Sequence, residues 1–185
     1  LLISTKAWFH PFMDGDAPFT LEKESLVKTE IDRIHKKLDS QLEQDAYYIV
    51  KDKLGSEYVE KNILNFKRLS DSFIKQPPCG EIDLLIANPD TKTIFVMDAK
   101  NMNKKLFTSA IDSELKVFFR GGSKKKSYLE KLNLKVGFIE DNINEIFKYF
   151  KITDTSDWKI KKGFVVNVLY LSAFYEEKVD FILLD

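Results

Sequence analysis

Residues 80–100 have the sequence GEIDLLIANPDTKTIFVMDAK, which predicts a β-hairpin at the centre of the fold. Its two apolar runs, 82–87 and 93–100, have the length and apolar character of strands. The intervening NPDTK, 88–92, contains the residue types that favour a tight turn. We therefore expect two neighbouring strands joined directly by that turn.

The chain before the hairpin is expected to be mainly helical. Apolar residues between 20 and 54 recur close to the helical period with charged residues between them, which predicts one long amphipathic helix. Val59, Ile63 and Phe66 then follow at spacings of 4 and 3, which predicts a second helix. The dipeptide 73–74, Phe-Ile, is the candidate for a short first strand.

The chain after the hairpin is expected to contain a short helix and a longer one. The short helix is predicted at 108–119. A capping box formed by Ser127 and Glu130 opens the longer helix, because the two side chains can satisfy each other's backbone N–H groups. Its apolar residues continue from 129 to 150 in steps of 3 and 4, which predicts a helix face buried in the core.

The last apolar runs, 163–170 and 179–184, are predicted to be strands. A hairpin followed by a long helix and a further strand favours a crossover to a parallel neighbour. The expected fold is therefore α/β, with a central mixed sheet flanked by helices and an added long N-terminal helix. We expect residues 1–54 to form this N-terminal helical extension and 55–185 to form the α/β domain.

The composition excludes several classes of protein. The 185 residues contain 29 Lys and Arg, 29 Asp and Glu and a single Cys, Cys79, so an intrachain disulfide or a Cys-based zinc site is excluded. The balanced charge is not that of a uniformly basic nucleic-acid binder, so any site for a polyanion must be a local patch. With no long apolar run, we expect a soluble, cytoplasmic protein without a membrane partner. Because the chain begins at Leu1, we expect it to be part of a longer protein, whose other domains, or further copies of the chain, are candidate partners.

Missing motifs restrict the chemistry further. His10 and His35 are the only histidines, which disfavours two-His metal sites and catalytic triads that need a histidine. The glycine-rich phosphate-binding patterns of P-loop and dinucleotide-binding folds do not occur. An enzyme with this sequence must therefore rely on carboxylates and lysines.

The hairpin itself carries such a set of residues. Strand alternation places Asp83 on one face of its strand, and places Asp98 and Lys100 together on one face of the next. Acidic groups on apolar strands are costly unless they are paired, and a divalent cation with hard oxygen ligands is a natural partner. A nearby lysine could orient a water or stabilise the charge that develops on a phosphate. Five acid-x-Lys triplets occur in the chain, but only Asp98-Ala99-Lys100 ends an apolar strand.

These residues resemble the PD-(D/E)XK nuclease superfamily, particularly its restriction-endonuclease-like members. The resemblance rests on Glu60, on GEID at 80–83 and on DAK at 98–100, and it covers about residues 55–170. It implies a restriction-endonuclease-like core of a helix, three strands, a helix and a strand. It also implies a nuclease that hydrolyses phosphodiester bonds of DNA with Mg²⁺ or Mn²⁺. By resemblance, Asp83 and Asp98 would bind the metal, Lys100 would assist the attacking water, and Glu60, from a helix, would support the metal or its waters.

Each of these assignments has a simpler alternative. Asp83 and Asp98 could be carboxylates at strand ends that form salt bridges with Lys100. Glu57 lies close to Glu60 in the sequence, and we favour Glu60 because it lies nearer the apolar helix face. As a whole, the chain could be a catalytically inactive nuclease-like scaffold that binds nucleic acid or a protein partner.

A group of lysines after the short helix could contact phosphates of the DNA backbone. The same group could equally be a solvated surface, as charged runs usually are. Its members are Lys124, Lys125, Lys126, Lys131 and Lys135.

Overall fold

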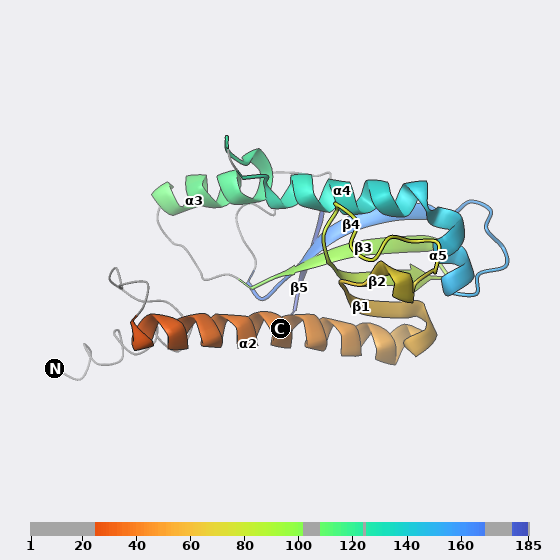
Figure 1. Ribbon diagram of the computed structural model, residues 1–185, viewed down its shortest axis with the longest axis horizontal. Coiled ribbons are helices and arrows are strands. Elements are labelled where there is room, and N and C mark those ends of the chain that lie inside the picture. Colours follow the sequence, from red (N-terminus) through yellow and green to blue (C-terminus); the bar gives the residue numbers. More distant parts are fainter. Residues whose placement is uncertain (1–24, 102–107, 124, 169–178, 185) are drawn as a thin grey trace.

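The computed structural model describes residues 25–101, 108–123, 125–168 and 179–184 of the chain. These residues form an α/β fold in which a twisted sheet lies between two helical layers (Figure 1). One layer is the long N-terminal helix α2, and the other is dominated by α4. The expected fold class of an α/β sheet flanked by helices is therefore confirmed.

The sheet has five strands in the order β1-β2-β3-β4-β5. Strand β2 pairs antiparallel with both β1 and β3, whereas β4 lies parallel to β3 and β5 lies parallel to β4. The sheet is mixed, as predicted, because α4 and α5 carry the chain back between β3 and β4. The strands are β1 (Val59–Ile63), β2 (Ile82–Asn88), β3 (Thr93–Lys100), β4 (Lys159–Val166) and β5 (Asp180–Leu183). The predicted hairpin is the β2–β3 pair.

The helices begin at the caps that their sequences provide. The Oγ of Ser25 accepts the N–H of Lys28 at the start of α2. The predicted capping box of Ser127 and Glu130 is present at the start of α4, which confirms that helix boundary. The helices are α2 (Leu26–Leu54), α3 (Thr108–Leu115) with the π-helical turn η3 (Lys116–Arg120), α4 (Tyr128–Asp141) and α5 (Ile143–Tyr149). The single helix expected over 129–150 is thus divided at Asn142.

The region between α2 and the hairpin differs from the prediction. Residues 59–63 form the edge strand β1 between the 3₁₀ turns η1 (Ser56–Tyr58) and η2 (Phe66–Arg68), so the predicted second helix is wrong. A spacing of four indicates one helix face, but Val59 packs in the cluster under α2 and Ile63 packs in the main core, on opposite faces of the sheet. Asn62 between them has a positive φ of 50° and interrupts the regular alternation of the strand. The short strand expected at 73–74 is also absent, since this dipeptide lies in an irregular segment; Phe73 is buried and Ile74 is exposed.

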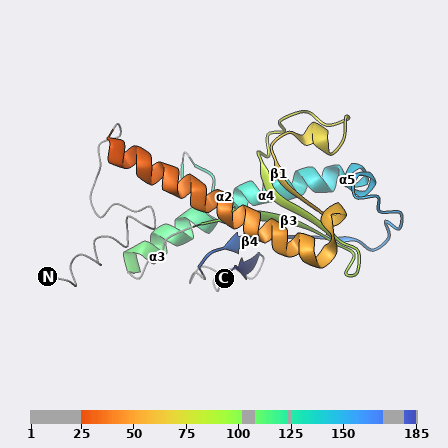
Figure 2. The same cartoon turned by 90° about the horizontal axis from the view of Figure 1, so that it is seen from below.

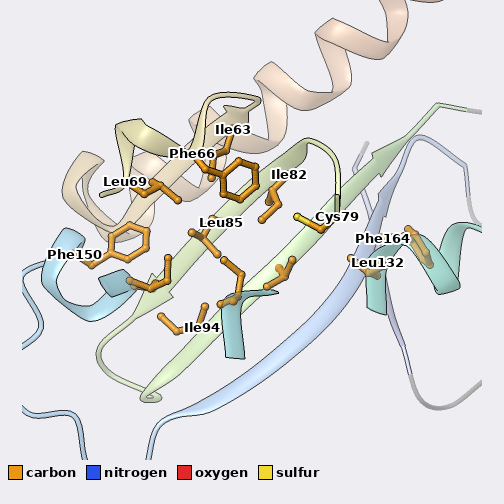
Figure 3. Close-up of a cluster of buried hydrophobic side chains, with 14 of the residues drawn as sticks. Ile63, Phe66, Leu69, Cys79, Ile82, Leu85, Ile94, Leu132, Phe150 and Phe164 are labelled. Atoms are coloured by element: carbon orange, nitrogen blue, oxygen red, sulfur yellow. The ribbon is translucent and has the colours of Figure 1, made fainter. Parts of the chain in front are cut away.

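The main hydrophobic core fills the space between the sheet and the helices α4 and α5. Figure 3 shows Ile63, Phe66 and Leu85 gathered on one side of the sheet with Phe150 beside them. A smaller cluster lies on the opposite face, where α2 packs against the hairpin. Its buried members are Leu42, Ala46, Val59, Leu84, Ile86, Met97 and Val165.

Only the second half of α2 covers the sheet. The first half continues beyond the strands (Figures 1 and 2), and Leu26 at its start is 88% exposed. The helix shares a core cluster with the strands, so it is packed as part of the sheet structure. Within the described part of the chain, no helix is sufficiently long and apolar to cross a membrane.

Candidate active site

The site lies where the two strands of the hairpin separate. Strands β2 and β3 are paired from the turn as far as Leu84 and Met97. Beyond that pair, β2 continues beside β1, and β3 continues beside β4 as far as Lys100. Asp83 and Asp98 are the first residues past the last β2–β3 pair. The sheet therefore opens at the point where the two predicted metal ligands lie.

A side chain joins the two strands across this opening. The Oδ2 atom of Asp83 accepts the backbone N–H of Ala99 at 2.8 Å. The carboxylate thus takes the place that a main-chain carbonyl would have if the strands had stayed paired. This bond fixes the Asp83 side chain on β2 relative to the end of β3.

Lys100 completes the set predicted from the sequence. Its Nζ lies 3.4 Å from Oδ2 of Asp83 and 3.4 Å from Oδ2 of Asp98. The same ammonium donates to the carbonyl oxygen of Ala99 at 2.8 Å. The structure therefore brings Asp83, Asp98 and Lys100 together, as strand alternation predicted.

A second lysine enters the same cluster from α4. The Nζ of Lys135 contacts Oδ1 of Asp98 and lies 3.9 Å from Oδ1 of Asp83. We predicted Lys135 to contact phosphates as an exposed residue, but its side chain is buried and paired with the aspartates. The sequence spacing could have indicated this burial, because Lys135 lies three residues after Leu132 and four before Ile139, on the buried face of the helix.

Burial and charge shift the protonation of these groups. The side chain of Asp98 is 3% exposed and that of Asp83 is 12% exposed. Burial, and then the charge of Asp98, raise the pKa of Asp83, although the two lysines oppose this shift. For Lys100, burial acts to lower the pKa, but the two aspartate charges together outweigh it and leave the pKa raised. The lysine is therefore held in its charged form.

Two further acids sense the charges of the cluster. Burial raises the pKa of Glu43, on α2, to about 7, with additional contributions from the charges of Asp83 and Glu81. Burial and the charge of Asp83 likewise raise the pKa of Glu81, which lies two residues before Asp83. Glu43 was not predicted from the sequence, which indicated only a helical extension over 1–54. No local pattern singles out this residue.

Glu60 has a different environment from the one expected. It lies on strand β1 opposite Leu85, so the prediction that it belongs to a helix is wrong. Its carboxylate pairs with Arg68, with Nη2 to Oε1 at 2.5 Å, and accepts the hydroxyl of Tyr149. Burial, followed by the bond to Glu60, raises the pKa of Tyr149. Among the described residues, those that line the cleft at the aspartates do not include Glu60.

A cleft of about 460 Å³ opens at the acid cluster. Besides the two aspartates and their lysines, Glu81, Tyr128, Lys126 and Lys131 line it. The ammonium groups of Lys100 and Lys131 lie 5.4 Å and 5.9 Å from the centre of the Tyr128 ring. Three of the lysines predicted to bind nucleic acid therefore line the cleft: Lys135 within the acid cluster, and Lys126 and Lys131 at its border.

Lys125 lies outside the cleft at the acid cluster. Lys125, together with Lys126 and Lys116, lines an adjoining hollow of about 180 Å³ beside the start of α4. Lys124 lies outside the described residues. The basic side of the cleft is thus formed by the loop before α4 and the first turn of that helix.

The donor set is compatible with a divalent cation. Asp83 and Asp98 offer hard carboxylate oxygens, and Mg²⁺ is commonly bound through one or two carboxylates with waters and phosphates as its other ligands. At the pair itself, the charges of Asp83 and Asp98 are matched by the ammonium groups of Lys100 and Lys135. Within the described ranges, however, no group of three or more His, Cys, Asp or Glu side chains is arranged to hold an ion. In the described part of the structure, the cations that contact the two aspartates are the ammonium groups of Lys100 and Lys135.

Comparison of the chain with protein-family models, with curated proteins and with solved structures found no match. The resemblance to PD-(D/E)XK nucleases stays a prediction based on the residues that carry it. What the site does must be inferred from its own side chains.

Proposed function

We propose that the chain is a metal-dependent nuclease that hydrolyses phosphodiester bonds of DNA. The observation that supports this function best is the convergence of Asp83, Asp98 and Lys100 where β2 and β3 separate. Buried acids are costly, and this cluster opens into a cleft bordered by lysines instead of being closed by apolar side chains. Perturbed acids and bases that share a cleft are typical of functional sites.

Asp83 and Asp98 would hold Mg²⁺ or Mn²⁺. When bound, such an ion lowers the pKa of a water and stabilises the negative charge of a phosphate under attack. Asp83 is suited to this role because Ala99 already fixes one of its oxygens, so little side-chain freedom remains to be lost. Glu43 and Glu81 add negative potential that attracts a cation to the cleft.

Lys100 would act on the water and the phosphate. Its ammonium is oriented by the Ala99 carbonyl, and its side chain is 20% exposed and lines the cleft, so it can act there while it stays paired. There it can orient the attacking water and stabilise the charge that develops on the phosphate oxygens. A donor placed in this way typically contributes about 10²–10³ in rate.

The basic border of the cleft would bind the DNA backbone. Lys126 and Lys131 flank the acid cluster on the side of Tyr128. Phosphate contacts of this kind position a nucleic acid without reading its sequence. They also offset the repulsion between a polyanion and four nearby carboxylates.

The proposal can be tested by cleavage of plasmid DNA with Mg²⁺, with and without EDTA. The Asp83→Asn/Asp98→Asn variant should lose cleavage and Mn²⁺ binding. Asp154→Asn, which changes an exposed aspartate paired with Lys92, should keep both. Cleavage that persists in the double variant would show that the nuclease site lies elsewhere or that the activity belongs to a contaminant.

A second candidate function is a nuclease-like scaffold that binds nucleic acid or a protein without cutting. The observation that favours it is the pairing of both aspartates with Lys100 and Lys135, which satisfies their charge without a metal. Binding of Mn²⁺ in calorimetry separates the two functions. A scaffold that is stabilised only by its internal ion pairs should show no saturable heat of binding.

A further inference from the structure

The two lysines of the acid cluster contact different edges of the carboxylates. Lys100 lies beside the Oδ2 atoms of Asp83 and Asp98, at 3.4 Å from each. Lys135 lies beside the two Oδ1 atoms. Each ammonium therefore bridges the aspartates, and Lys135 occupies the space between the oxygens that Lys100 leaves available.

The two lysines also differ in how they are held. Lys100 belongs to the same strand as Asp98, and it is anchored additionally by the Ala99 carbonyl. Lys135 reaches the aspartates from α4 at the end of a long, flexible side chain. Its side chain is 9% exposed and lines the cleft, so a change of rotamer can return its charge to water.

We propose that Lys135 is an internal counter-ion that occupies the cation position of the acid pair and is displaced when a divalent ion binds. This inference rests on the proposed metal-dependent function. Two adjacent buried carboxylates repel each other, and without a cation between them the fold would carry that repulsion. An ammonium in this position stabilises the metal-free protein. A divalent ion cannot occupy the same space, because the two positive charges would repel.

Removal of the Lys135 charge therefore has two opposite effects. The metal-free protein should become less stable, because the carboxylates lose one of their cations. The divalent ion should bind more tightly, because it no longer has to displace an ammonium. A lysine with a merely structural role would produce the first effect without the second.

The test compares Lys135→Met with the unchanged chain by calorimetric titration of Mn²⁺ and by thermal melting at several Mn²⁺ concentrations. We expect Mn²⁺ to bind Lys135→Met about tenfold more tightly, a difference of about 1.4 kcal/mol. Without Mn²⁺ the variant should melt at a lower temperature than the unchanged chain, and its Tm should rise more when Mn²⁺ is added. Lys148→Met, which changes an exposed lysine paired with Glu145, should bind Mn²⁺ as the unchanged chain does.

Lys135→Gln provides a second variant that keeps a hydrogen-bonding group but carries no charge. If Lys135→Met folds only when Mn²⁺ is present, that dependence itself supports the inference. If both variants bind Mn²⁺ no more tightly than the unchanged chain, which does bind it, the inference is overturned and the proposed function stands. If neither the unchanged chain nor either variant binds Mn²⁺, both the inference and the metal-dependent function are overturned.

Discussion

Replacement of Lys100 by alanine separates a catalytic role from a structural one. The variant loses one of the two cations that bridge Asp83 and Asp98, and it loses the donor that we assign to the attacking water. We expect a moderate fall in stability without divalent ions and a much larger loss of DNA cleavage. We also expect Mn²⁺ to restore most of the lost stability, because the ion replaces the missing charge.

The size of the stability effect follows from the contacts of the ammonium. Breaking a buried ion pair costs about 3–5 kcal/mol. The cost at Lys100 should be lower, about 2 kcal/mol, because its side chain is partly exposed and Lys135 remains beside both aspartates. For a chain of 185 residues this corresponds to a fall in Tm of about 4–8 °C.

The expected effect on catalysis is larger. Loss of one donor that acts in the transition state lowers the rate by a factor on the order of 10² or more. Arginine should restore little of it, because the planar guanidinium cannot occupy the position of a compact ammonium between two carboxylates. The two effects therefore differ both in size and in their response to Mn²⁺.

Thermal melting with and without Mn²⁺, together with single-turnover cleavage of plasmid DNA, measures both effects. Lys92→Ala is the matched control, since Lys92 pairs with the exposed Asp154 at 2.7 Å beside the other end of β3. It should leave melting and cleavage unchanged. A folded Lys100→Ala protein that cuts DNA at the original rate would refute the assigned role.

Three other changes test separate parts of the structure. The pKa of Glu43, raised from 4.5 to about 7, means that this residue stabilises the fold below pH 4.5 and loses that contribution as the pH rises towards 7. In urea unfolding, the Glu43→Gln variant should therefore be more stable than the unchanged chain at pH 8 and equally stable at pH 4. The expected difference at pH 8 is about 1 kcal/mol, a value reduced because the Glu43 side chain is partly exposed. Equal stability at both pH values would contradict the raised pKa. Lys126→Ala/Lys131→Ala should weaken DNA binding for all sequences and reduce the salt slope, measured by fluorescence anisotropy, by about 2. An unchanged slope would show that these lysines are only solvated. Gly163→Ala should lower the free energy of unfolding, measured in urea, by about 1–3 kcal/mol, because the new Cβ would lie 2.7 Å from a carbonyl oxygen of β5. In the control variant Gly137→Ala, the new Cβ meets no neighbour within 4 Å, and the change should stabilise α4. A stable Gly163→Ala protein would contradict the close packing of β4 against β5.

The parts of the fold that could be predicted are those specified by local sequence. Asn88 to Lys92 supply a turn between two apolar runs, and Ser127 with Glu130 marks the start of α4. Strand alternation places Asp98 beside Lys100 without any knowledge of the rest of the chain. In each case the relevant residues lie within a few positions of one another.

The features that could not be predicted depend on how elements distant in the sequence pack against one another. Val59 and Ile63 have the spacing of a helix face, and only pairing with β2 makes residues 59–63 a strand, in which these two side chains enter different clusters. Lys135 seemed a surface residue until α4 was placed on the sheet above Asp98. Glu43 senses the charges of Asp83 and Glu81 because α2 packs across one face of the hairpin, a contact that no local pattern indicates.

The bond between the Ala99 amide and Asp83 has a consequence for spectroscopy. A backbone proton donated to a carboxylate senses the charge on that carboxylate, and this amide belongs to the residue that follows Asp98 and donates to Asp83. Its resonance in a ¹⁵N spectrum should shift whenever Asp83 gains a proton or a ligand. A single main-chain probe would thus report on the state of the site in the unmodified protein, without any mutation or substrate.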